Sequence, residues 1–466
     1  MKKIAIVYGE ISNSIQKRAV KELTEFLLDY TCEYPVCVKY GELDLTHFRC
    51  IYIGTKENNP YIKKVSEKNL VHQEEYCIKV WDDYAIIEGS DDKGVLYGCI
   101  DFYNKYIVPN VYPHDQCVYW VNFLENDILP EFECSSYPSV KNRGLWTWGH
   151  VIYDYIGYID NMVKLKMNSL IIWNDFPPVN AKDIVEYAHS CGIKIFWGFP
   201  WLWDTDCAKI DIKSLDKMSE EIFKRYQNDY ASLGADGIYF QSFTELDEEY
   251  IEGVLIADAV TNFVNKTSEK FFNVYPDMIL QWGLHATSVK KKLDIIKKTN
   301  PKITIVWENC GSFPFGYIPK EVSDFEETIE FVDKISVLRG EEDNFGVVTK
   351  GLVKLNWNTF EHLKGSHYLG TSSSRMKAER VAFKSKIWKY IQAYWLSYAD
   401  KAYDMVRRLS DNKNGDLYVF ALVEDGMFEE NIMYPVALYS EMLWDKNSDI
   451  KELMPNVAMR SYVDFA

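Results

Sequence analysis

Residues 169–198, SLIIWNDFPPVNAKDIVEYAHSCGIKIFWG, contain a complete strand–helix–strand unit. Ser169–Trp173 and Lys194–Gly198 are short apolar runs of the kind that form buried parallel strands. Ala181–Ser190, which lies between them, has apolar residues at helical spacing. Parallel strands need a crossover connection of this length, and a helix usually supplies it. The segment therefore predicts an α/β fold built on a parallel sheet.

The same alternation of strand and helix continues in both directions along the chain. Eight strands are predicted, at Gly144–Trp148, Ser169–Trp173, Lys194–Gly198, Gly237–Gln241, Met278–Gly283, Thr304–Trp307, Gly346–Lys350 and His367–Gly370. Eight strands with helices between them favour a TIM (β/α)8 barrel. An open doubly wound sheet is the alternative, and it is disfavoured because no Gly-rich phosphate loop follows any of these strands.

Two further regions flank the predicted barrel. Residues 1–125 alternate strand and helix signals on a smaller scale and predict a small N-terminal α/β domain. Residues 126–142 contain prolines and lack periodicity, so they are interpreted as a linker to the barrel at residues 143–372. Residues 373–466 are predicted to form a largely helical segment packed on the barrel.

The composition limits the partners of the protein. The chain has 52 Lys and Arg against 69 Asp and Glu, a formal net charge of −17, which argues against nucleic acid as a partner. It has no apolar run of about 18 residues, no signal-peptide pattern at its start and no CxxC pair among its 10 cysteines. These features predict a cytoplasmic protein that needs no membrane and no cofactor. Self-association into a homo-oligomer is left open.

Tryptophans gather where the predicted strands end. Nine of the 14 lie there: Trp146, Trp148, Trp173, Trp197, Trp201, Trp203, Trp282, Trp307 and Trp357. Function in barrel enzymes collects at the carboxyl ends of the strands, and aromatic rings stack on the flat apolar faces of sugars. The bias therefore favours a carbohydrate site, with packing in the core as the alternative.

Carboxylates follow three of the same strands. Glu245 and Glu308 each come after a buried apolar strand, where packing does not need a carboxylate and desolvation is costly. Glycoside hydrolysis needs a proton donor and a second carboxylate, which this pair would supply. A structural ion pair is the alternative. Asp175 is a third catalytic candidate, although Asn-Asp-Phe-Pro-Pro is also good turn chemistry.

The predicted substrate-binding residues lie on the same strand ends. They are Trp148, Trp173, Asn174, Trp201, Trp203, Trp282, His285, Trp307, Lys350 and Trp357. His285 is suited to bond a sugar hydroxyl, with capping of a helix as the alternative. The spacing of His150, Asp175 and His285 is not diagnostic of a metal site, so no metal is predicted.

The N-terminal region resembles a domain of known glycosidases. Cys50–Pro60 (CIYIGTKENNP) and Tyr84–Tyr106 (YAIIEGSDDKGVLYGCIDFYNKY) are similar to the small domain before the barrel in family 20 hexosaminidases, family 84 enzymes and the α-glucuronidases of families 67 and 115. Arg143–Gly149 (RGLWTWG) resembles the first barrel strand of the same group. The resemblance implies a glycosidase with its general acid at the end of strand 4, which falls on Glu245.

The chain departs from parts of this group. Family 20 has Asp-Glu and family 84 has two adjacent Asp at strand 4, whereas Thr244 precedes Glu245 here. The exit of strand 7 offers Lys350 but no carboxylate. The α-glucuronidase pattern, with a lone Glu at strand 4 and a later carboxylate as base, is matched best, and Glu308 falls in the base role. The resemblance thus implies an exo-acting glycosidase, with inversion of configuration favoured.

Two other functions stay open from the sequence. A carbohydrate-binding or inactive glycosidase relative would keep the tryptophans without convergent carboxylates. A separation of Glu245 and Glu308 far outside about 5–10 Å would favour it. A metal-dependent barrel lyase or isomerase would need histidines and carboxylates to converge on a cation. Those residues would be His150, Asp175, Glu245 and His285.

Overall fold

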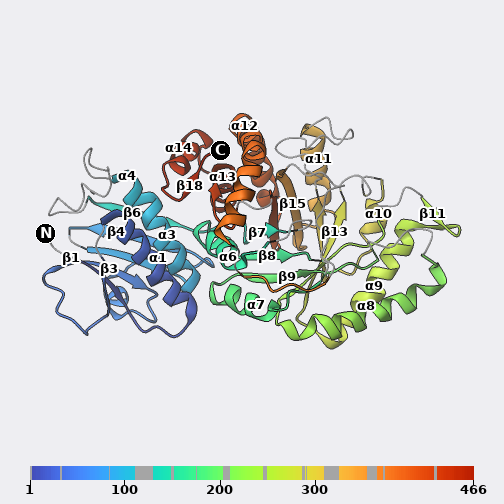
Figure 1. Ribbon diagram of the computed structural model, residues 1–466, viewed down its shortest axis with the longest axis horizontal. Helices are drawn as coiled ribbons and strands as arrows, with labels where there is room; N and C mark the ends of the chain where they lie inside the picture. The colour runs from blue at the N-terminus through green and yellow to red at the C-terminus, as the bar shows by residue number, and fades with distance from the viewer. Residues whose placement is uncertain are drawn as a thin grey trace. The chain divides into compact units, whose positions relative to one another are not determined.

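The chain forms two compact units in the computed structural model (Figure 1). The first consists of residues 1–139, 190–192 and 458–461, and the second of residues 140–189, 193–457 and 462–466. The structure describes residues 3–31, 34–82, 84–110, 130–147, 152–174, 176–202, 210–244, 249–285, 289, 291–308, 325–353, 365–370, 373–424 and 428–466.

The N-terminal unit is built on a six-stranded sheet with the order β2-β1-β3-β5-β4-β6. The strands are β1 (Lys3–Tyr8), β2 (Val36–Lys39), β3 (Phe48–Gly54), β4 (Tyr76–Trp81), β5 (Tyr84–Gly89) and β6 (Phe132–Ser136). Strands β1, β2, β3 and β5 are parallel, and β4 is antiparallel to both of its neighbours. The sequence did not predict β2 and β6, because these short edge strands are only partly buried and lack a clear apolar run. Strand β6 lies inside the segment interpreted as a linker.

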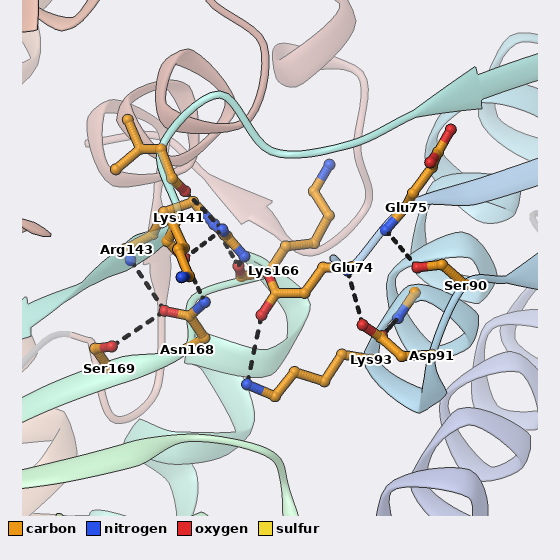
Figure 2. A network of polar contacts seen from close by, with 12 residues as sticks. Glu74, Glu75, Ser90, Asp91, Lys93, Lys141, Arg143, Lys166, Asn168 and Ser169 are labelled. Carbon is orange, nitrogen blue, oxygen red and sulfur yellow. Dashed lines mark hydrogen bonds and ion pairs between the residues drawn. The ribbon is translucent and has the colours of Figure 1, made fainter. Parts of the chain in front are cut away.

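Helices pack against this sheet. They are α1 (Ser14–Thr31), α2 (Pro60–Val65), α3 (Asp92–Phe102), a π-helical turn (Tyr103–Ile107) and α4 (Val108–Asn110). Helices α1 and α3 lie side by side on one face (Figure 1). Asp91 fixes the start of α3, because its side chain accepts hydrogen bonds from the backbone amides of Gly94 and Glu74 (Figure 2).

The second unit contains a closed barrel of eight parallel strands, which confirms the predicted fold class. The strand order is β10-β13-β14-β15-β16-β7-β8-β9. The strands are β7 (Asn142–Trp146), β8 (Ser169–Ile172), β9 (Lys194–Gly198), β10 (Gly237–Phe240), β13 (Ile279–His285), β14 (Ile303–Glu308), β15 (Phe345–Leu352) and β16 (Leu417–Val423).

The prediction of the eighth strand was wrong. His367–Gly370 is not a strand, and β16 closes the barrel between β15 and β7 instead. Strand β16 (LYVFALV) is buried at all seven positions, as expected for a central parallel strand. It was missed because it follows a long helix inside residues 373–466, which were predicted to be largely helical. The barrel therefore extends beyond residue 372.

Helices surround the barrel (Figure 1). They are α6 (Tyr155–Lys164), α7 (Ala181–Ser190), η3 (Ile212–Ser214), α8 (Leu215–Asp229), η4 (Ala231–Leu233), α9 (Ile256–Val274), α10 (Leu293–Ile296), α11 (Phe325–Ser336), α12 (Ser374–Asp411), α13 (Tyr434–Trp444) and α14 (Ile450–Ala458). Short strand pairs complete the described part of the unit: β11 (Tyr250–Ile251) with β12 (Val254–Leu255), and β17 (Ile432–Met433) with β18 (Val463–Asp464). No helix in the described ranges is long and apolar enough to cross a membrane.

Alternate residues of the barrel strands point into its interior. The inner cluster consists of Trp146, Ile171, Trp173, Phe196, Tyr239, Val306, Val348, Val353, Tyr418, Phe420 and Leu422. Residues between these positions face the surrounding helices, because successive side chains of a strand point to opposite faces. Trp307 illustrates this: it follows the inward-facing Val306, and its ring lies 5.3 Å from that of Phe331 on α11.

A buried polar network closes the amino-terminal end of the barrel. The Arg143 guanidinium, on β7, donates hydrogen bonds to the backbone carbonyls of Lys166 and Val140 (Figure 2). The Lys166 ammonium forms an ion pair of 3.0 Å with Glu441 on α13, and both side chains are almost fully buried. Both cations also lie over the Trp444 ring, Lys166 at 4.3 Å and Arg143 at 5.1 Å from its centroid.

Candidate active site

Polar side chains gather inside the barrel at the carboxyl ends of neighbouring strands. Tyr239 lies on β10 and Gln241 directly follows it, while His285, Glu308 and Lys350 lie on β13, β14 and β15. His285 and Glu308 end their strands as register partners. In barrel enzymes the reaction takes place at this end of the strands. The cluster is therefore the candidate active site.

Glu308 is at the centre of the cluster and is fully buried. Its Oε1 accepts hydrogen bonds from the Tyr239 hydroxyl (2.6 Å) and the Gln241 amide (2.5 Å). Its Oε2 accepts one from the Lys350 ammonium at 2.9 Å. Burial raises the pKa of the Glu308 carboxyl, but Lys350 and the hydrogen bonds from Tyr239 and Gln241 outweigh burial and hold it below its usual range. Glu308 is therefore ionised at neutral pH and is suited to accept a proton or stabilise a cation.

Lys350 and His285 complete the electrostatics of the cluster. Lys350 is almost fully buried, and its ammonium lies 5.2 Å from the centroid of the Trp146 ring. Burial, together with the positive charge of Lys350, lowers the pKa of His285 to about 4. The imidazole is therefore neutral near pH 7, and in this form one ring nitrogen is an acceptor and the other a donor.

Gly283 is what allows Tyr239 and Glu308 to meet. A Cβ atom at this position would lie 2.2 Å from the Tyr239 hydroxyl and 2.7 Å from Glu308 Oε1. Glycine inside a strand often marks such a close approach. Gly198 has a similar effect on β9, where a Cβ would lie 2.6 Å from the Trp173 ring. Two strand glycines thus shape the space around the inner side chains.

Two glutamines near Tyr239 keep unused hydrogen-bonding capacity: Gln241, which also contacts Glu308, and Gln281, the register partner of Tyr239 on β13. Gln241 Oε1 and both polar atoms of the Gln281 side chain are buried and have no hydrogen-bond partner among the described residues. Gln281 lies two positions before Gly283 on β13, so it points to the same side of the strand. A buried polar atom left unsatisfied costs about 1–3 kcal/mol. These amides are therefore candidates to bind a polar ligand.

Trp173 and Asn174 lie near this cluster. The Trp173 ring belongs to the inner cluster and meets the Tyr239 ring edge-on, at 6.1 Å between centroids. Asn174 follows it in the chain, and its buried Nδ2 has no hydrogen-bond partner within the described ranges. Of the predicted substrate-binding residues, the structure thus brings Trp173, His285 and Lys350 to the inner side of the barrel.

The structure does not bring three other predicted tryptophans to Glu308. Trp201 stacks on Phe240 at 3.7 Å and lies 5.3 Å from Phe271 of α9. Trp282 lines a small cavity together with residues of α9 and α10. Trp307 packs against α11. All three are buried between strands and helices. Packing in the core, the alternative that the sequence left open, describes these three side chains.

The other predicted site residues lie outside the described residues. They are Glu245, Asp175, Trp148, Trp203 and Trp357. Their roles and the separation of Glu245 from Glu308 therefore stay predictions. Among the residues that are described, no group of three or more His, Cys, Asp or Glu side chains is arranged to hold a metal ion.

Sequence reasoning missed Tyr239, Gln241, Gln281 and Gly283. None belongs to a residue type that stands out alone, but a signal existed. Each is at an inward position of a strand that precedes a candidate residue, and counting in steps of two from the strand end would have found them. The sequence does not show which side chains of other strands contact Glu308.

Glu424 was missed for a different reason. It follows β16, the strand that the sequence did not identify, and it continues the inward-facing positions 418, 420 and 422. Its buried carboxylate accepts a 2.6 Å hydrogen bond from Lys384 of α12. A carboxylate at the exit of the eighth strand is a further candidate for the site.

Comparisons with known proteins identify relatives of the fold. No family model matches the chain, and no match to it was found among curated proteins. The solved structure of CpGH84B is similar, with a TM-score of 0.55, 12% identity and coverage of 98% of this chain and 70% of that one. A GH138 enzyme that targets pectin rhamnogalacturonan II has a TM-score of 0.53 and 12% identity, with coverage of 97% of this chain and 65% of that one.

A third solved structure with the same fold is the family GH115 4-O-methyl-α-glucuronidase BtGH115A, which has specificity for decorated arabinogalactans. Its TM-score is 0.52 and its identity 12%, with coverage of 96% of this chain and 57% of that one. The chain thus spans less than two thirds of the length of the GH138 enzyme and of BtGH115A. At this identity the likeness concerns the fold, and the chain shares its architecture with these glycoside hydrolases.

Proposed function

We propose that the protein is a glycoside hydrolase with its active site around Glu308. The observation that carries the proposal is a fully buried, ionised carboxylate at the carboxyl end of a barrel strand, beside amides with unused hydrogen-bonding capacity. A purely structural carboxylate does not need such amides around it. The likeness in fold to glycoside hydrolases supports the same reaction class.

Glu308 is proposed as the second carboxylate and not as the proton donor. A carboxyl group whose pKa is held low is ionised at neutral pH and has no proton to give. A carboxylate has about four lone-pair sites, and Tyr239, Gln241 and Lys350 use three. One site is left to take a proton from water, which is the role of the base in an inverting glycosidase.

Glu245 is proposed as the general acid. It follows β10, and Tyr239 on that strand and Gln241 directly after it reach past β13 to donate hydrogen bonds to Glu308. Glu245 is four residues after Gln241 in the sequence, and the resemblance to the glycosidase group implies the general acid at this position. Asp175, which follows Asn174 beyond β8, is proposed as a supporting carboxylate.

The enzyme is proposed to be exo-acting and either hexosaminidase-like or α-glucuronidase-like.

The test is a panel of aryl glycosides of both anomers, including glucuronides and N-acetylhexosaminides. Glu308→Gln and Glu245→Gln are each expected to lower turnover by about 100-fold or more, because each removes a proton-transfer group. Glu220→Gln is the matched control, since Glu220 is an exposed residue of α8 paired with Lys270. Unchanged turnover in Glu308→Gln would contradict the proposed role of Glu308.

A carbohydrate-binding or inactive relative is the second candidate function. The observation behind it is the ion pair of the fully buried Glu308 with Lys350, because a carboxylate with a structural role has the same features. It predicts that sugars change tryptophan fluorescence without being hydrolysed.

If the protein hydrolyses a glycoside, stereochemical analysis of the product by NMR distinguishes inversion from retention of configuration.

A further inference from the structure

The N-terminal sheet has a second face that is covered very differently from the first. Helices α1 and α3 lie on one face (Figure 1). Among the described residues, the opposite face carries the six-residue helix α2 and a row of aromatic side chains. We call the following five residues the aromatic row: Tyr40, Tyr52, Tyr61, Trp81 and Tyr84.

The rings of the aromatic row follow one another across the sheet. Tyr61 of α2 stacks on Tyr52 of β3, with 3.7 Å between centroids and 14° between planes. Tyr84 of β5 lies 6.4 Å from Tyr52 at 25°, and Trp81 of β4 lies 6.2 Å from Tyr84 at 33°. Tyr40 lies 6.0 Å from Tyr61. The rings of Tyr61, Tyr52 and Tyr84 are thus close to parallel, and the Trp81 ring is tilted beside them. Together they form a platform with a step at Tyr61.

The platform is open to solvent at part of its rings. Tyr84 is 39% exposed and Tyr40 is 38% exposed, Tyr61 and Trp81 are half-buried, and Tyr52, on which Tyr61 stacks, is 4% exposed. Single exposed aromatic residues are normal, but contiguous ones mark a binding surface. The exposed tyrosines also carry hydroxyls beside their ring faces, so the surface combines apolar area with hydrogen-bonding groups.

Three lysines and two glutamates beside the aromatic row form ion pairs with one another. Glu88 pairs with Lys56 at 3.7 Å, and Glu133 pairs with Lys68 at 2.9 Å and with Lys79 at 3.5 Å. The platform is therefore flanked by ion pairs and not by a field of one sign. Such a surface suits a neutral ligand, whereas a polyanion or an anionic membrane surface requires excess positive charge.

We propose that the aromatic row binds a chain of neutral sugar residues. Pyranose rings present flat C–H faces to aromatic rings and hydroxyls at their rims, which matches near-parallel rings with tyrosine hydroxyls beside them. The aliphatic core of a protein partner would leave these hydroxyls without hydrogen bonds. The proposal concerns a site of the N-terminal unit and does not rest on the chemistry of Glu308.

The experiment is affinity electrophoresis of the full chain in gels that contain soluble β-glucan, xylan, galactomannan or amylose. At least one of these is expected to retard the wild-type protein. Trp81→Ala/Tyr84→Ala is expected to weaken that binding by about tenfold or more, because it removes two adjoining rings. The control is Tyr137→Ala, which removes a 48% exposed tyrosine of the same unit that stacks on His72 instead.

Three outcomes would overturn the proposal. The first is that none of the four neutral polysaccharides retards the wild-type protein. The second is that the double variant is retarded as much as the wild type. The third is that light scattering shows a wild-type dimer that the double variant loses, while neither protein binds sugar. Should the double variant fail to fold, as judged by its melting temperature, Tyr84→Ala alone decides. Turnover of a small aryl glycoside is expected to be unchanged, so failure of the proposed hydrolysis and failure of sugar binding are read separately.

Discussion

Among the described residues, the barrel unit has an almost fully buried Lys–Glu pair at each end of the barrel, and the two pairs have nearly the same geometry. Lys166 and Glu441 are 3.0 Å apart at the amino-terminal end, and Lys350 and Glu308 are 2.9 Å apart at the carboxyl end. All four side chains are almost fully buried. Distance and burial alone therefore do not tell a structural pair from a functional one.

The surroundings of the two pairs differ. Lys166 lies on the Trp444 ring, next to an Arg143 guanidinium whose hydrogen bonds go to backbone carbonyls. Glu308 instead shares its carboxylate among groups from two other strands. One of these groups, Tyr239, is the register partner of Gln281, whose side-chain amide has no hydrogen-bond partner among the described residues. The position at the strand end and the polar atoms without partners therefore identify the candidate site. The ion pair alone does not.

Removing both charges of each pair tests this comparison most strongly. Glu308→Gln/Lys350→Met is expected to lower turnover by about 100-fold or more, because the ionised carboxylate is lost. Glu441→Gln/Lys166→Met makes the same chemical change at the other end and is expected to keep turnover within about threefold. The measurement is turnover of the best aryl glycoside by each double variant.

The free energy of unfolding of each variant is the control, because it shows whether a loss of turnover comes from unfolding. Replacing both partners of a buried ion pair is often neutral or stabilising by about 1–4 kcal/mol, whereas removing one partner costs about 3–5 kcal/mol. Urea unfolding should therefore show a large loss for Glu441→Ala and little loss for either double variant. Equal turnover by the two double variants would show that both pairs are structural.

Gly283→Ala sharpens the comparison by moving Glu308 without changing any charge. The added methyl group would lie 2.2 Å from the Tyr239 hydroxyl and 2.7 Å from Glu308 Oε1, so these groups must shift. We expect a fall in turnover of about tenfold or more, because small displacements of catalytic groups are costly. Overpacking should also lower the free energy of unfolding by about 1–3 kcal/mol.

The control for this variant is Gly365→Ala, because a Cβ atom at Gly365 would meet nothing within 4 Å. It is expected to match the wild type in turnover and stability. If Gly283→Ala unfolds more easily but keeps full turnover, the position of Glu308 does not matter for the reaction and the cluster is structural.

The pH dependence of stability tests the environment of His285. Its pKa is about 4 in the folded protein, against 6.5 for an ordinary histidine. Between these values the unfolded chain binds a proton that the folded chain does not, so stability rises with pH through this window. His285→Gln should remove this rise, and the slope should fall by about one proton. Urea midpoints between pH 4 and pH 7 measure it.

His189 is the matched control for this measurement. The hydrogen bond from its ring to Asp236 raises the pKa of His189, so its stabilising contribution is present below pH 6.5 and is lost as the pH rises through the folded pKa. His189→Gln should therefore leave the slope between pH 4 and pH 6.5 unchanged. An unchanged slope in His285→Gln would contradict a buried neutral imidazole beside Lys350.

The sequence predicted the barrel because seven of its strands are compact apolar runs between amphipathic helices, a local signal. It failed for β16 because the strand follows helix α12, which has 38 residues, and nothing in the local pattern shows that the chain then returns to close a barrel. Closure is a long-range property: β16 pairs with β7, which lies at the other end of the barrel sequence.

The candidate site was predicted in part for a similar reason. Glu308 and Lys350 were recognised because charged residues at the ends of apolar strands are unusual, and the structure places them together. Their other partners, Tyr239 and Gln241, were missed because contacts across the barrel depend on its curvature, which the sequence does not display. Tryptophans do gather at the strand ends, but some point into the barrel and others point toward the helices. Adjacent residues of a strand point to opposite faces, so a shift of one residue separates the two groups.

Trp307 gives the smallest expected effect and isolates that single-residue difference. It directly precedes Glu308, yet its ring lies between β14 and Phe331 of α11. Trp307→Phe should lower the free energy of unfolding by about 1–3 kcal/mol through lost packing and leave turnover within about threefold. Trp173→Phe is the inward counterpart, because the Trp173 ring contacts Tyr239. It should lower turnover more than Trp307→Phe does. If Trp307→Phe were the more damaging to turnover, the tryptophans that pack against the helices would belong to the substrate site after all, and the alternation of inward and outward positions would not separate function from packing.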